Sequence, residues 1–425
     1  MAFGFLMLAS ILRFIAKGWV YDMYLKPKIF FPYFGFEWVK PFGQTGMYIL
    51  FIALAIAALF IALGFLYRIS TTFFFLAFTY VELIDKTNYL NHYYFISIAS
   101  FLIIFLPANR YFSVDATLNK KIAATHVPNY FVLTIKFQVF IVYFFAGIAK
   151  LNSDWLLHAQ PLKIWLPAHS EMPLIGTLLT KEWTAYFFSW FGCIYDLLIP
   201  FFLFIPRFVR PAYFFVIVFH LATSLFFNIG MFPYIMICLT TIFFTENFHI
   251  RIIHFLKAFT KSTTKNEQTV FSPSAKTLKL FSVLFIIHFT IQLILPFRYA
   301  LYPGNLFWTE QGYRFSWRVM LMEKAGTAFF YVHDRTTNGE IEIDNKKYLT
   351  YMQEKMMATQ PDMMIDYAKF LKAEFIKQGF KDPIIRAQSY VTLNGSGSRE
   401  FIDPQVDLSS QSNSFLKNKD WVKKY

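Results

Sequence analysis

Long uncharged stretches alternate with short polar connections over the first 296 residues. The clearest is Met47 to Tyr67, which contains no charged side chain. A helix of about 20 apolar residues is long enough to cross a hydrocarbon core of about 30 Å. Further apolar stretches, several of which are short or carry a charge, occupy residues 1–21, 70–84, 93–107, 130–150, 183–205, 208–227, 233–245 and 278–296. The pattern therefore predicts about nine transmembrane helices.

The pattern changes at residue 297, after which no apolar run is long enough to span a membrane. Phe329–Val332 and Ile341–Ile343 flank a polar turn at Asn338-Gly339, which is typical of a β-hairpin. Residues 348–380 predict helix interrupted near Pro361, and residues 384–393 predict a further strand. We therefore expect a mainly α protein with two domains: a polytopic membrane helix bundle over 1–296 and a small water-exposed α+β domain over 297–425.

Composition supports the membrane assignment and gives an orientation. Hydrophobic residues make up 56% of the chain and charged residues 16%, against about 45–50% and about 25% in an ordinary soluble protein. More lysines and arginines fall in the connections on the side of the N-terminus than on the other side, which predicts a cytoplasmic N-terminus and an exoplasmic C-terminal domain. The basic stretch 257–265 has few aromatic residues, so we interpret it as a solvated loop and expect no nucleic-acid partner.

Lys150 is a functional candidate because an ionisable group inside an apolar run is costly to keep there. It ends the run that begins at Tyr143, which lies two helical turns earlier on the same face, with Gly147 between them. Desolvation favours the neutral amine, and a neutral lysine is a competent general base. A lysine that extends toward the lipid headgroups accounts for the same pattern.

Other polar residues in the apolar half allow two interpretations each. His92 follows Asn91 at the start of an apolar run, where the pair either binds a polar group or begins a helix at the interface. His220 either meets a substrate oxygen or bonds a neighbouring helix. Asp196 is expected to pair with a cation such as Lys136, or to cap a break in its helix. The histidines show no metal-ligand spacing, and no nucleotide-binding or zinc motif is present, so we expect no metal.

The chain resembles the vitamin K-dependent γ-glutamyl carboxylase family, with its HTTM-type membrane domain, in several blocks of sequence. These blocks are Asp85–His92, Tyr143–Trp155, Phe219-His220 followed by Asn228–Tyr234, Trp308–Trp317 and Ile402–Asp407. They occur in the family's order, and the resemblance runs from the first helix to about residue 410.

The resemblance implies an integral membrane lyase that couples two reactions. A reduced naphthoquinone, vitamin K hydroquinone, reacts with O₂ to give the 2,3-epoxide, and a peptide glutamate captures CO₂ at its γ-carbon. The glutamate carbon acid is too weak for any side chain tuned to neutral pH, so the strong base must come from quinone oxidation. By resemblance, Lys150 is the base that deprotonates the hydroquinone, and His92 with Asn91 assists oxygenation. The resemblance also places five residues at the quinone or glutamate site: Tyr143, His220, Trp317, Val319 and Met320.

Departures from the family indicate a short, bacterial-type relative in the inner membrane with a periplasmic active site. Tyr299 stands where relatives often carry histidine, and Cys193 and Cys238 both lie in apolar runs, so the family's structural disulfide has no counterpart. The N-terminus is shorter than expected, and the long C-terminal extension that holds substrate propeptides is missing. The partners implied are the bilayer, a reduced naphthoquinone and a glutamate-containing peptide. The alternatives are a quinone epoxidase without carboxylation, a membrane acyltransferase, and a non-catalytic lipid or quinone binder or transporter.

Overall fold

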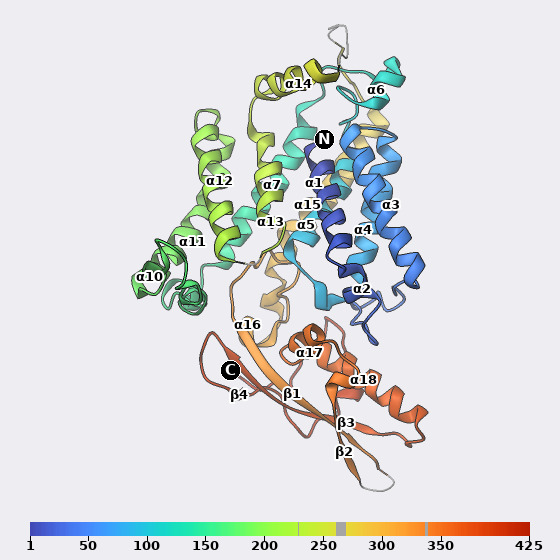
Figure 1. The fold of residues 1–425 in the computed structure, drawn as a ribbon, viewed down its shortest axis with the longest axis vertical. Helices are drawn as coiled ribbons and strands as arrows, with labels where there is room; N and C mark the ends of the chain where they lie inside the picture. The colour runs from blue at the N-terminus through green and yellow to red at the C-terminus, as the bar shows by residue number, and fades with distance from the viewer. Residues whose placement is uncertain (228, 261–268, 336–338) are drawn as a thin grey trace.

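The computed structural model describes residues 1–227, 229–260, 269–335 and 339–425, and it separates into a helix bundle and a sheet-bearing part (Figure 1). The bundle consists of α1 (Ala2–Ala16), α3 (Gln44–Leu63), α4 (Tyr67–Ile84), α5 (Asn91–Phe105), α7 (Asn129–Ala149), α11 (Glu182–Phe204), α12 (Val209–Phe226), α13 (Phe232–Thr240), α14 (Glu246–Thr260) and α15 (Ala275–Ile294). Short helices connect them: α2 (Trp19–Tyr24), α6 (Val114–Leu118), α8 (Ser153–Leu156), α9 (Leu162–Trp165) and α10 (Gly176–Leu179).

Within the described residues, five helices are long and apolar enough to cross a membrane. They are α3, α7, α11, α12 with the turn before it, and α15. The segments Phe232–Phe243 and Glu246–Lys257 meet at 113° and add a sixth span if they count as one. α1 and α5 are apolar but only 15 residues long. The chain is thus a multi-pass membrane protein, and the predicted nine spans are not reached by this criterion.

Small residues let the central helices pack closely. A Cβ atom on Gly4 of α1 would lie 2.4 Å from the backbone nitrogen of Ala62 in α3. A Cβ atom on Gly147 of α7 would lie 2.8 Å from the backbone nitrogen of Leu197 in α11. Such close approaches are typical of helix pairs in membranes. Gly147 therefore brings α7 against α11, and this contact places Lys150 beside the middle of α11.

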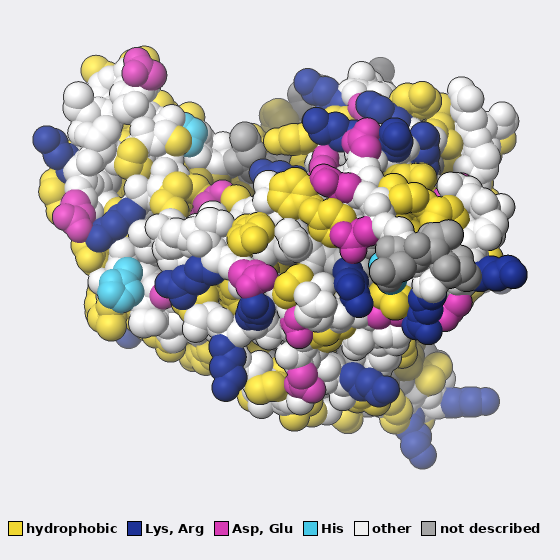
Figure 2. Space-filling view, turned by 90° about the horizontal axis from the view of Figure 1, so that it is seen from below, with side chains coloured by type: hydrophobic (Ala, Val, Ile, Leu, Met, Phe, Trp, Pro, Cys, Tyr) yellow, Lys and Arg dark blue, Asp and Glu magenta, His cyan; other side chains and the backbone are white. Residues whose placement is uncertain are grey.

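The sheet-bearing part is an antiparallel α+β unit at one end of the bundle (Figure 1). Its strands β1 (Lys324–His333), β2 (Glu340–Ile343), β3 (Ile384–Leu393) and β4 (Arg399–Glu400) have the order β2-β1-β3-β4. The predicted hairpin is confirmed, with Phe330 opposite Ile343, although Asn338 of its turn lies outside the described residues. α17 (Tyr351–Met357) and α18 (Pro361–Lys377) cover the sheet, with the predicted interruption just before Pro361. Seen from this end, the surface mixes positive and negative side chains (Figure 2).

Buried polar contacts join the two parts. Lys86, which follows α4, forms ion pairs with Asp362 at 2.9 Å and Asp366 at 2.7 Å in α18. Gln353 of α17 donates to a carboxylate oxygen of Asp85 at 3.0 Å. Burial opposes ionisation of Asp362, but Lys86 and the Arg314 guanidinium, 2.7 Å away, hold the pKa of Asp362 well below its usual value. These contacts fix the sheet-bearing part against one end of the bundle, which we call the sheet end.

Candidate active site

Lys150 and Asp196 form a buried ion pair at the sheet end. Lys150 caps the C-terminus of α7, and its Nζ lies 2.6 Å from a carboxylate oxygen of Asp196 in α11. The two side chains are only 8% and 6% exposed. The lysine is therefore withdrawn from solvent, as the first interpretation requires. The expectation that Lys136 partners Asp196 is wrong. Lys136 lies in the first half of α7, away from Lys150, and its Nζ is 5.4 Å from the centre of the Phe243 ring.

The ion pair lies in the wall of a narrow cavity of about 90 Å³, which we call the apolar chamber. Its wall also contains Tyr143, Trp155, His220 and Met236. The Tyr143 hydroxyl lies 2.8 Å from Nε2 of His220. Nδ1 of His220 is buried and has no hydrogen-bond partner among the described residues. An unpaired buried imidazole nitrogen in an apolar cavity suits a ligand that carries a ring hydroxyl or carbonyl.

A second cavity, of about 300 Å³, lies next to the first, and we call it the polar chamber. It is lined by charged and polar residues that include Lys86, Asn91, His92, Arg314 and Arg318. Arg318 is 8% exposed, and it forms no ion pair within the described part of the chain. Burial lowers the pKa of its guanidinium, which nonetheless stays charged near neutral pH. A buried cation without an anion favours an acidic ligand.

The two chambers share part of their walls. Ile229, Phe232, Val319 and Met320 line both. The Phe232 ring lies 6.0 Å from the His220 ring and 6.3 Å from the His92 ring, centre to centre. A ligand in the apolar chamber and a ligand in the polar chamber therefore come close together across this shared wall.

The segment from residue 315 to 320 carries unusual backbone conformations. Phe315, Trp317 and Met320 have φ of 63°, 58° and 53°. Left-handed φ at such residues costs about 1–2 kcal/mol each and persists where surrounding contacts enforce it, often at functional sites. Asn91 supplies one such contact, because its Nδ2 donates to the backbone oxygen of Arg318 at 2.8 Å. Asn91 thus holds the segment that carries Val319 and Met320.

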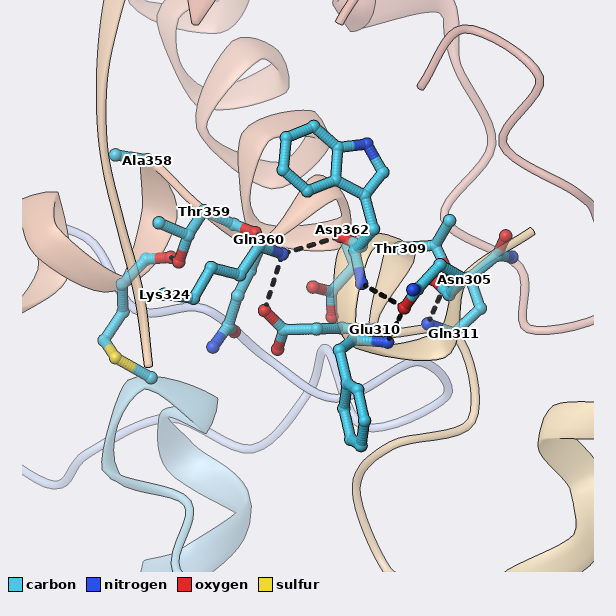
Figure 3. Close-up of polar contacts among 12 residues, drawn as sticks. Asn305, Thr309, Glu310, Gln311, Lys324, Ala358, Thr359, Gln360 and Asp362 are labelled. Atoms are coloured by element: carbon cyan, nitrogen blue, oxygen red, sulfur yellow. Dashed lines mark hydrogen bonds and ion pairs between the residues drawn. The ribbon is translucent and has the colours of Figure 1, made fainter. Parts of the chain in front are cut away.

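A polar cluster supports the same region from the side of the sheet (Figure 3). Nζ of Lys324, at the start of β1, lies 2.9 Å from a carboxylate oxygen of Glu310 and donates to the backbone oxygen of Thr359 at 2.7 Å. Asn305 caps α16 (Leu306–Thr309) by accepting from the backbone nitrogen of Phe307 at 2.8 Å. Glu310 also lines the polar chamber, so Lys324 neutralises a carboxylate that would otherwise repel an acidic ligand there.

The residues singled out from the sequence fall into three groups. Lys150, Tyr143 and His220 line the apolar chamber, Asn91 and His92 line the polar chamber, and Val319 and Met320 line both. Trp317 lines neither, since its ring packs 5.0 Å from Tyr94 and 6.0 Å from Phe95. The resemblance covered the segment 317–320 but did not single out Arg318 within it, and sequence reasoning did not identify Asp196 as the partner of Lys150. Asp196 could have been found from the sequence, because it is a charged residue inside an apolar run. Arg318 could not, because it lies in a segment where other residues are also charged.

The apolar helices and the enclosed, charged chambers define a multi-pass membrane protein with an enzyme-like site. The family model of the HTTM domain matches residues 1–248, and that of the vitamin K-dependent gamma-carboxylase lumenal domain matches residues 277–425. The chain belongs to the vitamin K-dependent gamma-carboxylase family, as its sequence blocks indicate. No solved structure matches the chain.

Proposed function

We propose that this protein oxygenates a reduced naphthoquinone to its 2,3-epoxide and uses that reaction to carboxylate the γ-carbon of a peptide glutamate. One observation carries the proposal. A buried Lys150–Asp196 pair lies in the wall of an apolar chamber, and that chamber shares a wall with a chamber that holds a guanidinium without an ion pair among the described residues. The first suits an aromatic diol and the second suits a carboxylate.

In this proposal the Lys150–Asp196 pair acts as one proton acceptor. The pair has no net charge when Lys150 is protonated and Asp196 is ionised. The proton of a ring hydroxyl goes to the Asp196 carboxylate, or to the Lys150 amine when Asp196 already holds the shared proton; either way the pair becomes cationic, and the ammonium of Lys150 then lies beside the new oxyanion. In a site that excludes water, this attraction is stronger than in bulk solvent. The pairing thus provides both the base and the counterion for a hydroquinone.

At about 90 Å³ the apolar chamber is smaller than the range of about 300–1,000 Å³ typical of small-molecule sites, so in this proposal its side chains move apart when the ring binds and then orient it. His220, fixed by its contact with the Tyr143 hydroxyl, presents Nδ1 to a second ring oxygen. The bound hydroquinone supplies the reducing electrons for O₂. We assign His92 to the oxygen-reacting side, because it lies across Phe232 from His220.

In the polar chamber, we assign Arg318 to the carboxylate of the substrate glutamate. A guanidinium offers a planar fork that matches a carboxylate. Its aliphatic and ring surroundings, with the Tyr299 ring 4.5 Å away, restrict its position. This basic pocket favours carboxylation over epoxidation alone, because a pure epoxidase has no use for a buried cation there. It also disfavours the acyltransferase and transporter alternatives. CO₂ would enter as the third substrate.

The same arrangement supports a proposal for the location. We propose that the bundle spans a bacterial inner membrane, that the domain boundary falls near residue 297, and that the sheet end faces the periplasm. Both chambers lie at that end, so a peptide would reach the polar chamber from the water phase while the quinone would enter from lipid.

The test uses the purified protein in detergent with reduced vitamin K, O₂, labelled bicarbonate and a glutamate peptide. Epoxide and fixed carbon are measured separately. We expect Lys150→Ala to lose both products, and the matched control Lys136→Ala, in the same helix, to keep both. Epoxide formation at the wild-type rate in Lys150→Ala would refute the assigned base. Wild-type epoxide formation with no fixed carbon would leave an epoxidase and refute the carboxylase half.

A further inference from the structure

A third cavity lies between α4 and α5, outside the two chambers already described. It measures about 300 Å³, which is the lower end of the range for small-molecule sites. Five tyrosines line it, together with Glu82: Tyr24, Tyr33, Tyr89, Tyr93 and Tyr94. We call this cavity the tyrosine slot. Its lining has no residue in common with that of the apolar chamber, and Tyr89 lines both the slot and the polar chamber.

The slot has a polar end and an apolar end. Glu82 lies in the last turn of α4, at the sheet end of the bundle, with Tyr89 and Asn88 just beyond it. Phe75, Ile98 and Phe101 line the other end, about two helical turns deeper. The long direction of the slot follows the helices. A ligand that fits this layout has a polar head at the membrane edge and an aliphatic tail toward the bilayer centre.

The carboxylate of Glu82 determines the chemistry of the head. It accepts a hydrogen bond from Ser97, and it forms no ion pair within the described part of the chain. An ionised carboxylate within apolar surroundings requires a cation or further donors. The surrounding tyrosine rings also attract cations through their π faces. An organic ammonium satisfies both features at once, because its N–H groups donate to Glu82 while its charge lies against the rings.

We propose that the tyrosine slot binds an aminophospholipid, with the primary ammonium of its ethanolamine headgroup paired to Glu82 and an acyl chain along Phe75 and Phe101. Such a lipid presents an ammonium at the depth of the membrane edge, where Glu82 lies. A bound headgroup would also stabilise the neighbouring segment, because Phe315 lines the slot with its ring 5.1 Å from Tyr89 and 5.6 Å from Tyr33. The segment that begins at Phe315 continues to Val319 and Met320 of the two chambers.

The test is native mass spectrometry of the detergent-purified full chain, titrated with phosphatidylethanolamine and phosphatidylglycerol of identical acyl chains. We expect the wild type to retain phosphatidylethanolamine preferentially. Glu82→Gln, which keeps the side-chain volume, should weaken phosphatidylethanolamine binding about tenfold without changing phosphatidylglycerol binding. The matched control is Glu246→Gln, which changes an exposed residue of α14 outside the lining of the slot. This variant should bind both lipids as the wild type does.

A second variant covers the case in which Glu82→Gln does not fold. Tyr33→Leu keeps the carboxylate and removes one ring, and it should also weaken phosphatidylethanolamine selectively. Equal retention of the two lipids by the wild type would overturn the proposal. So would full competition by an uncharged menaquinone, which would show that the slot recognises a ring and not an ammonium. Neither readout depends on epoxide formation or carbon fixation.

Discussion

The Lys150–Asp196 pair predicts a specific pattern of stability among three variants. Lys150→Met leaves the Asp196 carboxylate without its partner in a site where both side chains are less than 10% exposed. Removing one member of a buried ion pair costs about 3–5 kcal/mol, because the remaining charge is uncompensated. Asp196→Leu is expected to cost a similar amount, since it leaves the Lys150 ammonium without a carboxylate, beside the Ala146 backbone oxygen at 3.2 Å and the Trp155 ring at 5.4 Å.

The double variant Lys150→Met/Asp196→Leu should recover most of this loss. It replaces two charges with apolar side chains in walls that are already apolar, and such replacements are often neutral or stabilising. The three variants and the wild type therefore form a double-mutant cycle with a large coupling energy. The assay is the folded fraction after heating in detergent, measured by size-exclusion chromatography with identical heating times for all four proteins. Strict additivity, with the double variant least stable, would refute a direct buried pair.

The same cycle separates folding from chemistry. The double variant should fold and yet form epoxide more slowly by about 10²–10⁴-fold, which is the usual contribution of a general base. A double variant that is folded and fully active would show that the pair is structural only.

Four further outcomes are expected. Arg318→Gln should raise the KM for a glutamate peptide while epoxide formation without peptide stays near wild type, and an equal loss of both would contradict its role in carboxylate binding. Gly147→Ala should push α7 from α11 and reduce activity, because its Cβ would lie 2.8 Å from the Leu197 backbone nitrogen, whereas Gly43→Ala, with nothing within 4 Å, should not. His220→Leu should slow epoxide formation, since it removes the nitrogen left unpaired in the apolar chamber; an unchanged rate would exclude that contact. The depressed pKa of Asp362 means that the folded state keeps this carboxylate ionised at a pH where the unfolded state takes up a proton, so its contribution to stability is present above about pH 4 and is lost as the pH falls further. Asp362→Asn should therefore lower the free energy of unfolding by about 3 kcal/mol at pH 7, and its stability should converge with that of the wild type in acid. A stability difference that stays constant across pH would contradict this.

The sequence was informative wherever a local pattern decides the structure. Apolar runs predicted α3, α7, α11, α12 and α15 because the length and polarity of a span are properties of consecutive residues. The hairpin β1–β2 and the break before Pro361 were also predictable, since turn residues and proline act locally. The number of spans was harder, because α1 and α5 are short and the segment after Phe232 bends by 113°.

The site could be predicted in part. Lys150 was identifiable because an ionisable residue in an apolar run is rare, but its partner depends on how α7 lies against α11. That contact is set by Gly147 and Leu197, which are 50 residues apart in the sequence and carry no charge. Trp317 lies in a recognisable block, yet it has a left-handed φ and its ring packs on Tyr94 outside the lining of both chambers. Only the folded backbone reveals this packing.

Proton transfer from the hydroquinone to the Lys150–Asp196 pair can be observed by itself in an anaerobic absorbance measurement. Purified protein is mixed with reduced vitamin K in the absence of O₂, CO₂ and peptide, so that proton transfer is the only reaction open to the site. We expect the wild-type protein to convert the hydroquinone spectrum to that of its deprotonated form, and Lys150→Met/Asp196→Leu to bind the hydroquinone without this change. The same spectral change in the folded double variant, or none in the wild type, would contradict this expectation.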